Sequence, residues 1–311
     1  IRRSIISATT KAFRPDLFIV DKEPLGLKKE VLPTLQWLKR SLPCARSVLG
    51  LRDIMDDAES IRSSWRKKGV YDVLESLYDE IWVYGIQSFY DPIVEYDIPA
   101  AVRRKIYFTG YIPRKVPSPE EVRREKRRHC LTEKAPLVVV TTGGGGDGYP
   151  VMDAFLTMLE SFGRPLPFRS ILITGPFMPK KQRKDVYRRA KALGVRSYHF
   201  YRQMEKVLAA ADLVISMGGY NTLCEILSQK ALPLIIPRET PRKEQLIRAE
   251  RFRDHGIAEY IPWHQVSPEI LRDKVLLLLE QPESFQSAIR RFSMTGIEVM
   301  QERLNAFRCN L

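Results

Sequence analysis

One stretch of the chain decides its fold, residues 212–256, which read DLVISMGGYNTLCEILSQKALPLIIPRETPRKEQLIRAERFRDHG. The apolar run 213–216 has the length and composition of a buried parallel strand, and the Met-Gly-Gly turn at 217–219 breaks it before a helical pattern begins. A second apolar strand, 234–237, is followed by a polar loop and another helix. This alternation of strand and helix predicts an α/β domain with a parallel sheet.

The glycines Gly218 and Gly219 stand where the first strand gives way to a helix N-terminus. Free backbone N–H groups and the helix dipole favour an anion there, and glycines without a Cβ let a diphosphate come close to the backbone. Glu225 lies one turn into the helix, on the side of the same loop. A carboxylate there repels phosphate but can accept hydrogen bonds from the vicinal hydroxyls of a ribose, so the pattern predicts a nucleotide site.

A family resemblance rests on the Gly-Gly loop, the Asn221-Thr222 pair, Glu225, a Pro-ended strand and the Glu244-Gln245 pair. This pattern resembles the donor half of GT-B glycosyltransferases, and it is most similar to the family 28 type C-terminal domain of MurG and MurG-like proteins. The resemblance implies that Glu225 binds the ribose of a UDP-sugar and that Gln245 binds the sugar. Packing alone also explains many Gly-Gly loops, and a helical glutamate is often only solvated.

A second glycine loop, Gly143-Gly-Gly-Gly-Asp-Gly148, follows the apolar strand 137–142. It matches G-x-G-x-x-G formally, but the next strand ends in Thr-Gly-Pro without the acidic residue that binds an NAD ribose, and no Lys-Ser/Thr follows the glycines as in a P-loop. By resemblance, the loop faces a diphosphate or sugar, and the segment beginning at His199 brackets the uracil base. Phe200 and Tyr201 of that segment are equally consistent with core positions.

The resemblance thus implies a donor-binding set drawn from both glycine loops, the base-binding segment and the helix starts. Its members are Gly143, Gly144, Gly145, Phe200, Tyr201, Met204, Gly218, Gly219, Tyr220, Asn221, Thr222, Glu225, Glu244 and Gln245.

Composition bounds the partners of this 311-residue chain. It carries 51 basic and 37 acidic residues, a net charge of +14, which favours an acidic partner. No nucleic-acid motif accompanies the charge, so we expect an anionic membrane surface rather than DNA or RNA. The four cysteines, at 44, 130, 224 and 309, and the four histidines show no disulfide or zinc pattern. We expect a cytoplasmic protein, peripheral to the inner face of the membrane, with no metal and no cofactor beyond the UDP-sugar.

Two Rossmann-like doubly wound domains facing a cleft are the predicted architecture, a GT-B fold. The predicted spans are 1–113 for an acceptor-side domain, 114–135 for a linker and connecting helix, and 136–311 for the nucleotide-sugar domain with its terminal helices. By resemblance, those terminal helices pack back toward the first domain. The chain opens within a helix, IRRSIISATTKAF, without an initiator methionine, so we expect an incomplete first domain that lacks an N-terminal segment.

Asp21 and Asp53 follow predicted strands of the first domain, where an acceptor would be held, and they are the candidates for the catalytic base. Each is equally suited to capping a helix or turn, and the base is alternatively expected in the absent segment. The resemblance implies a hexosyltransferase that moves a sugar, an N-acetylhexosamine, from a UDP-sugar to a lipid-linked or glycan acceptor with inversion and without a metal. A UDP-sugar epimerase and a non-catalytic nucleotide-sugar-binding subunit are the alternatives.

Overall fold

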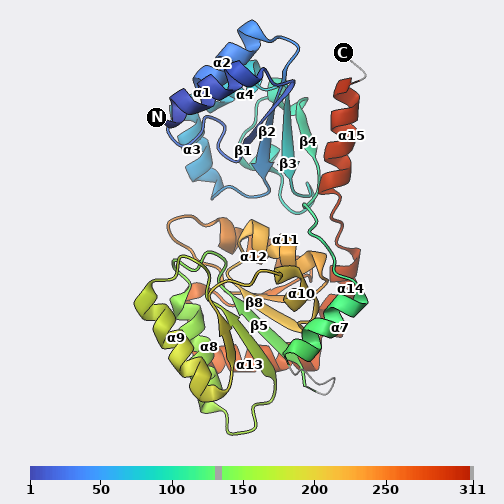
Figure 1. Ribbon diagram of the computed structural model, residues 1–311. Helices are drawn as coiled ribbons and strands as arrows, with labels where there is room; N and C mark the ends of the chain where they lie inside the picture. Colours follow the sequence, from blue (N-terminus) through green and yellow to red (C-terminus); the bar gives the residue numbers. More distant parts are fainter. Residues whose placement is uncertain (130–134, 309–311) are drawn as a thin grey trace. The chain divides into compact units, whose positions relative to one another are not determined.

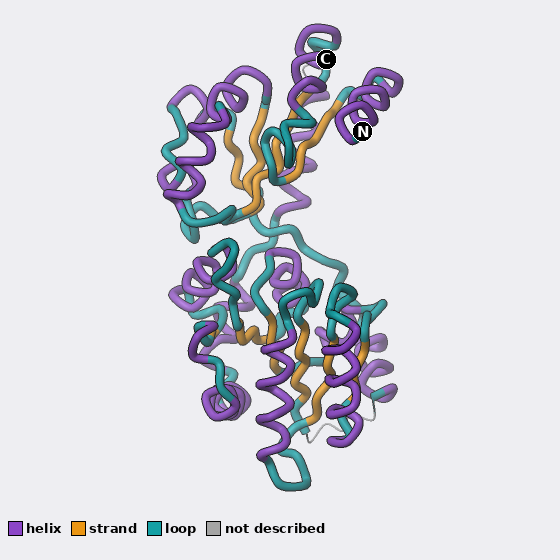
Figure 2. The backbone as a smooth tube through the Cα atoms, turned by 90° about the vertical axis from the view of Figure 1, so that its left-hand side faces the viewer, coloured by secondary structure: helices purple, strands orange, loops and turns teal. Residues whose placement is uncertain are grey.

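The computed structural model describes residues 1–129 and 135–308, and its strands form two parallel sheets (Figure 1). The chain divides into two compact units. Unit 1 combines Ile1–Ile112 with the terminal segment that starts at Ser293, and unit 2 is Pro113–Phe292. Figure 2 shows the strands of each unit as a separate group flanked by helices and loops.

Unit 1 contains four parallel strands in the order β1-β2-β3-β4. Their bounds are β1 (Leu17–Asp21), β2 (Arg46–Arg52), β3 (Glu80–Tyr84) and β4 (Ile106–Phe108). The helices along this part of the chain are α1 (Arg2–Phe13), α2 (Leu32–Ser41), α3 (Ala58–Lys68), α4 (Val70–Leu77), α5 (Pro92–Glu95) and α6 (Ala100–Arg103). All five residues of β3 are buried, as expected for a strand inside a parallel sheet.

The last helix, α15 (Gly296–Arg308), belongs to unit 1. The Gly296 N–H donates to the Tyr111 carbonyl over 3.0 Å. The Arg303 guanidinium lies 3.8 Å from the centroid of the Tyr107 ring and pairs with the buried carboxylate of Glu80. These contacts attach α15 to unit 1, whereas the helices before it belong to unit 2. The structural division therefore differs from the predicted span 136–311, which placed all terminal helices in the second domain.

Unit 2 contains a six-stranded parallel sheet in the order β10-β9-β8-β5-β6-β7. Its strands are β5 (Leu137–Thr141), β6 (Arg169–Ile173), β7 (Arg196–Tyr198), β8 (Leu213–Ser216), β9 (Leu232–Ile235) and β10 (Glu259–Tyr260). Its helices are α7 (Pro119–Arg128), α8 (Tyr149–Ser161), α9 (Lys180–Leu193), α10 (Met204–Ala209), α11 (Tyr220–Ser228), α12 (Glu244–Asp254), α13 (Pro268–Glu280) and α14 (Glu283–Arg291), with a 3-10 turn, η1 (Trp263–Gln265). The strand order reverses between β5 and β8, which confirms a doubly wound sheet.

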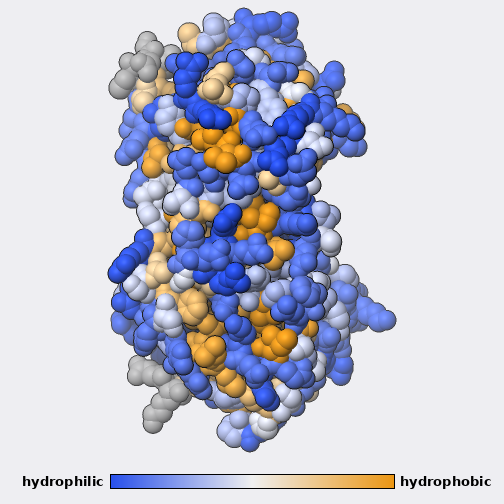
Figure 3. All heavy atoms as spheres, turned by 180° about the vertical axis from the view of Figure 1, so that it is seen from behind, coloured by the Kyte–Doolittle hydropathy of each residue, from blue (hydrophilic) through white to orange (hydrophobic). Residues whose placement is uncertain are grey.

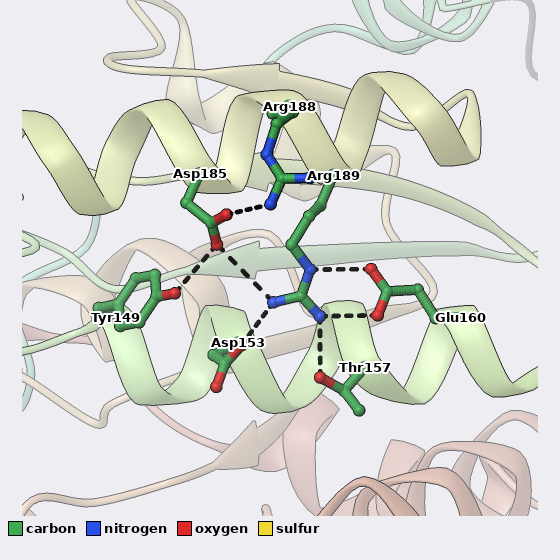
Figure 4. Close-up of polar contacts among 7 residues, drawn as sticks. All are labelled: Tyr149, Asp153, Thr157, Glu160, Asp185, Arg188 and Arg189. Atoms are coloured by element: carbon green, nitrogen blue, oxygen red, sulfur yellow. Dashed lines mark hydrogen bonds and ion pairs between the residues drawn. The ribbon is translucent and has the colours of Figure 1, made fainter.

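Helices α8 and α9 lie side by side, and a charged network joins them (Figure 4). Arg189 of α9 donates from Nε and Nη2 to the two carboxylate oxygens of Glu160 on α8, over 2.8 and 2.9 Å. The same guanidinium reaches the Thr157 hydroxyl and the Asp153 carboxylate. The bond from Arg189 holds the pKa of Glu160 below its ordinary value. This bidentate pairing fixes the two helices on one another.

No helix among the described residues is long and apolar enough to cross a membrane. On the face drawn in Figure 3, hydrophilic residues predominate and hydrophobic residues form separate patches.

Candidate functional site

The loops after β5 and β8 meet at the carboxyl edge of the second sheet. Ligands of open α/β sheets bind outside the strand ends at the point where the strand order reverses, which here is between these two strands. The Thr222 Oγ1 lies 3.5 Å from the position that a Cβ on Gly143 would occupy and 3.9 Å from that of a Cβ on Gly219. Both glycine loops therefore face the same hydroxyl at the start of α11.

Three of the five predicted loop glycines, Gly143, Gly145 and Gly218, have a positive φ, and Gly145 and Gly218 are crowded as well. Gly145 has a φ of +83°, and a Cβ there would lie 2.0 Å from the Thr174 carbonyl oxygen. Gly218 has a φ of +74°, and its Cβ would lie 2.7 Å from Ile235 Cγ2. A side chain at either position is strained and crowded, so these two glycines shape the loops whether or not a ligand binds.

Gly219 and Gly144 are different because space lies beside them. Gly219 has a φ of −61° and forms the N-cap of α11. A Cβ added there would lie 3.9 Å from the Thr222 hydroxyl oxygen, with no closer neighbour. A Cβ on Gly144 would approach only the ring of Phe177, at 3.2 Å, and that ring is exposed. Neither packing nor conformation demands glycine at Gly219, so the space beside it is open to a ligand.

Glu225 lies one turn into α11 and is half-buried. Its carboxylate accepts no hydrogen bond from the described residues. Burial raises its pKa above the ordinary glutamate value, the nearby Glu205 carboxylate adds to the rise, and Arg114 opposes it. A partly desolvated carboxylate without donors is a site that ligand hydroxyls can satisfy.

Arg114, in the segment predicted to be a linker, contacts the candidate site. Its backbone N–H donates to the Ser228 Oγ over 2.8 Å, and its guanidinium Nη2 donates to the Asn221 Oδ1 over 3.2 Å. Asn221, Glu225 and Ser228 are spaced by four and three residues, so they share one face of α11. The segment that carries Arg114 lies along that face and places a cation beside the Glu225 carboxylate.

Arg248 of α12 is a second cation that the sequence pattern did not reveal. Its side chain is only 1% exposed, and its Nη1 donates to the Gly218 carbonyl over 3.0 Å. The guanidinium lies 5.9 Å from the centroid of the buried Tyr220 ring. Arg248 thus holds the Gly218 loop from its buried side and adds positive charge there. Tyr220, predicted to contact the donor, faces this interior and offers only its backbone at the helix start.

Glu244 and Gln245 organise the loop after β9. The Arg238 guanidinium donates to the Glu244 carboxylate over 3.2 Å and to the Asp147 carboxylate, in the first glycine loop, over 2.9 Å. The Gln245 Oε1 accepts from the Arg238 N–H over 3.1 Å. These contacts join two predicted loops, the first glycine loop and the loop after β9, with Arg238 as the common partner.

The segment after β7 that is predicted to bind the base has two faces. Phe200 is 67% exposed, whereas Tyr201 is 6% exposed. The Tyr201 hydroxyl lies 2.7 Å from His129 Nε2 and also contacts the Glu125 carboxylate, in a buried cluster with α7. Tyr201 therefore serves the core, and Phe200 is the aromatic ring available to a base. Met204 begins α10 and is half-buried.

The two candidate bases in unit 1 also differ. Asp53 is 2% exposed and accepts a 2.7 Å hydrogen bond from the Tyr111 hydroxyl, so its carboxylate is enclosed in the fold. Asp21 is exposed at the end of β1 and lies 3.6 Å from an Arg52 nitrogen. Burial raises the pKa of the neighbouring Tyr84 to about 12. Of the two carboxylates, only that of Asp21 is accessible to an acceptor.

Within residues 1–129 and 135–308, no group of three or more His, Cys, Asp and Glu side chains is arranged to hold a metal ion. Cys44 is exposed and Cys224 is buried. Cys130 and Cys309 lie outside the described residues.

Comparison with known proteins shows which family this part of the chain matches. Residues 152–304 match the glycosyltransferase family 28 C-terminal domain. The chain is 28% identical over 152 residues to the UDP-N-acetylglucosamine--N-acetylmuramyl-(pentapeptide) pyrophosphoryl-undecaprenol N-acetylglucosamine transferase of Streptococcus agalactiae serotype Ia. That match covers 48% of this chain and 40% of the relative, so the chain spans less than half of the relative's length in the match.

Two solved structures share the fold across nearly the whole chain. MurG from Acinetobacter baumannii superposes with a TM-score of 0.65 at 13% identity, covering 96% of this chain and 77% of that one. The UDP-GlcNAc 2-epimerase from Neisseria meningitidis, bound to UDP-GlcNAc, gives 0.66 at 13% identity, covering 98% and 80%. Residues 152–304 are thus a glycosyltransferase family 28 C-terminal domain, and the chain that contains them is a MurG-like protein of the GT-B fold.

Proposed function

We propose that unit 2 binds a UDP-sugar and that the protein transfers the sugar, an N-acetylhexosamine, to an acceptor hydroxyl. The observation that carries this proposal is Glu225, a half-buried carboxylate without a hydrogen-bond donor, beside an open glycine loop at a helix N-terminus. The ribose hydroxyls would satisfy the carboxylate while the diphosphate lies against the loop. The transferase name of the Streptococcus agalactiae relative supports the same donor class.

The leaving group of such a reaction is the diphosphate, whose developing charge needs stabilisation. Unit 2 supplies the N-terminal N–H groups of α11, the buried Arg248 guanidinium beneath the loop, and Arg114 along the helix face. Fixed dipoles and cations of this kind serve as the electrostatic stabiliser, and a metal is not needed for that role.

The acceptor hydroxyl needs a general base. Asp21 is the accessible carboxylate of the two candidates, and we assign it this role in the proposal. Attack from the face opposite the departing diphosphate would invert the anomeric centre.

The acceptor and the location of the protein are part of the same proposal. The relative from Streptococcus agalactiae is named for an undecaprenol-linked acceptor, and the net charge of +14 favours an anionic surface. We therefore propose a lipid-linked acceptor and peripheral binding at the cytoplasmic face of the membrane.

A second candidate is a UDP-sugar epimerase, favoured by the structural similarity to the Neisseria meningitidis epimerase. Incubation of the full-length protein with UDP-GlcNAc and a lipid acceptor distinguishes the activities, because transfer releases UDP and epimerisation yields the C2 epimer. Release of UDP that depends on the acceptor supports transfer. The C2 epimer without UDP release would establish the alternative, and UDP binding without either product would leave a donor-binding subunit.

A further inference from the structure

A basic cavity lies at the amino-terminal edge of the second sheet, at the other end of β6 from the donor site. Its volume is about 460 Å³, and its described walls include the α8–β6 loop and the starts of β6 and β7. Strand β6 has five residues, which separates the cavity from the carboxyl edge by about 16 Å. The donor site described above uses none of its lining residues.

Three arginines, Arg164, Arg169 and Arg196, line the cavity, and none of its described lining residues carries a carboxylate. Arg169, the first residue of β6, has no hydrogen bond or ion pair from its guanidinium to the described part of the chain. Like charges repel one another, and an anion between them relieves that repulsion.

The other two arginines are held in place by backbone carbonyls. Arg164 Nη2 donates to the Ala192 carbonyl over 2.6 Å, near the end of α9, and Arg196 Nη1 donates to the Arg128 carbonyl over 2.8 Å, at the end of α7. Each helix C-terminus contributes about half a negative charge, which partly offsets the charge of the arginine that it binds. Arg169 has no such carbonyl partner among the described residues.

Ser170 supplies an independent sign of a ligand. It lines the cavity at 8% exposure, and its Oγ is buried without a hydrogen-bond partner. A buried hydroxyl without a partner is unfavourable, and rotation about its Cα–Cβ bond directs the O–H toward an acceptor in the cavity.

We propose that this cavity is a second anion site, which binds a phosphate monoester between the arginine side chains with Ser170 as a donor. Arginine forks pair with phosphate oxygens in a bidentate manner, and the volume leaves room for an organic group on the phosphate. The phosphate belongs either to a soluble metabolite or to a lipid headgroup.

Calorimetry with glycerol 3-phosphate tests the soluble form, and saturating UDP occupies the donor site during the titration. The Arg169→Ala variant is expected to bind glycerol 3-phosphate about tenfold more weakly or worse, since a charged hydrogen bond is lost. Ser170→Ala is expected to weaken binding without lowering the melting temperature, because it removes a hydroxyl that has no partner in the fold. Arg251→Ala, which removes an equal charge from an exposed position on α12, is the matched control and should bind glycerol 3-phosphate normally.

Vesicles identify the source of the phosphate. Phosphatidic acid presents glycerol 3-phosphate as its headgroup, whereas phosphatidylglycerol presents a phosphodiester. Sedimentation with phosphatidic acid vesicles that is weakened by Arg169→Ala, but not by Arg251→Ala, assigns the site to a lipid. Loss of glycerol 3-phosphate binding alone assigns it to a soluble ligand. Equal effects of the two arginine variants, or no binding of either probe to the wild-type protein, would overturn the proposal.

Discussion

Removal of the Glu225 carboxylate should weaken UDP binding strongly. In the proposed complex the carboxylate accepts one hydrogen bond from each ribose hydroxyl, and it is already partly desolvated before the ligand arrives. Hydrogen bonds to a charged group contribute about 1.5 kcal/mol each at the lower end of their range, so two amount to about 3 kcal/mol, or about 150-fold in Kd. Calorimetric titration of Glu225→Ala with UDP measures this loss directly.

A deoxy ligand makes the assay specific for the ribose contact. Loss of the 2′-hydroxyl should cost the wild-type protein about tenfold in Kd, because one charged hydrogen bond disappears. The Glu225→Ala variant should bind UDP and 2′-deoxy-UDP nearly equally, since the partner of that hydroxyl is already gone.

The control for this experiment is Asp273→Ala, which removes an exposed carboxylate from α13 and should leave UDP affinity unchanged. If the 2′-hydroxyl contributes the same free energy in the wild-type protein and in Glu225→Ala, the two groups do not interact and the reasoning is refuted.

Three further predictions concern the loop, the pH dependence and the surface charge. Gly219→Val should fold normally yet bind UDP at least tenfold more weakly by calorimetry. Gly163→Val, also in open space but in the loop between α8 and β6, should bind UDP normally. Normal UDP binding to Gly219→Val would remove the loop from the site. Burial raises the pKa of Glu225 in the folded state, so the stability associated with this group is complete below the unfolded-state pKa and is lost as the pH rises through the folded-state pKa. Urea denaturation should therefore find Glu225→Gln more stable than the wild-type protein at pH 7, with a difference that shrinks as the pH falls; a difference independent of pH would contradict the assigned shift. Because basic residues contribute about 1 kcal/mol each near an anionic surface and are screened by salt, the protein should sediment with anionic vesicles at low salt and be released at high salt, and equal binding to neutral vesicles would argue against membrane association through charge.

The strands were predictable where the apolar pattern is unambiguous. Residues 213–216 form β8 with the predicted bounds, and β5 ends one residue before the end of the predicted strand 137–142, because each is a short apolar run followed by a glycine loop. Helix α9 was not predicted. Only Val186 and Ala190 of its fourteen residues are buried, so its sequence lacks a wide apolar stripe.

The site was less predictable than the fold because its cations act through tertiary contacts. Arg248 reads as an ordinary solvated arginine on a helix, yet folding buries it under a loop thirty residues earlier in the chain. Arg114 follows a proline in an apparent linker, and only the path of that segment along α11 reveals its role. Phe200 and Tyr201 are adjacent, and the sequence alone gives no indication of which ring faces the core.

Hydrogen exchange in the presence and absence of UDP tests the central claim most directly, because backbone N–H groups of the two glycine loops are proposed to meet the diphosphate. The account predicts that saturating UDP slows exchange in residues 142–150 and 217–225 of unit 2, and that exchange in Ile1–Ile112 is unchanged by UDP alone. Unchanged exchange in both loops, with protection confined to Ile1–Ile112, would contradict the placement of the nucleotide in unit 2.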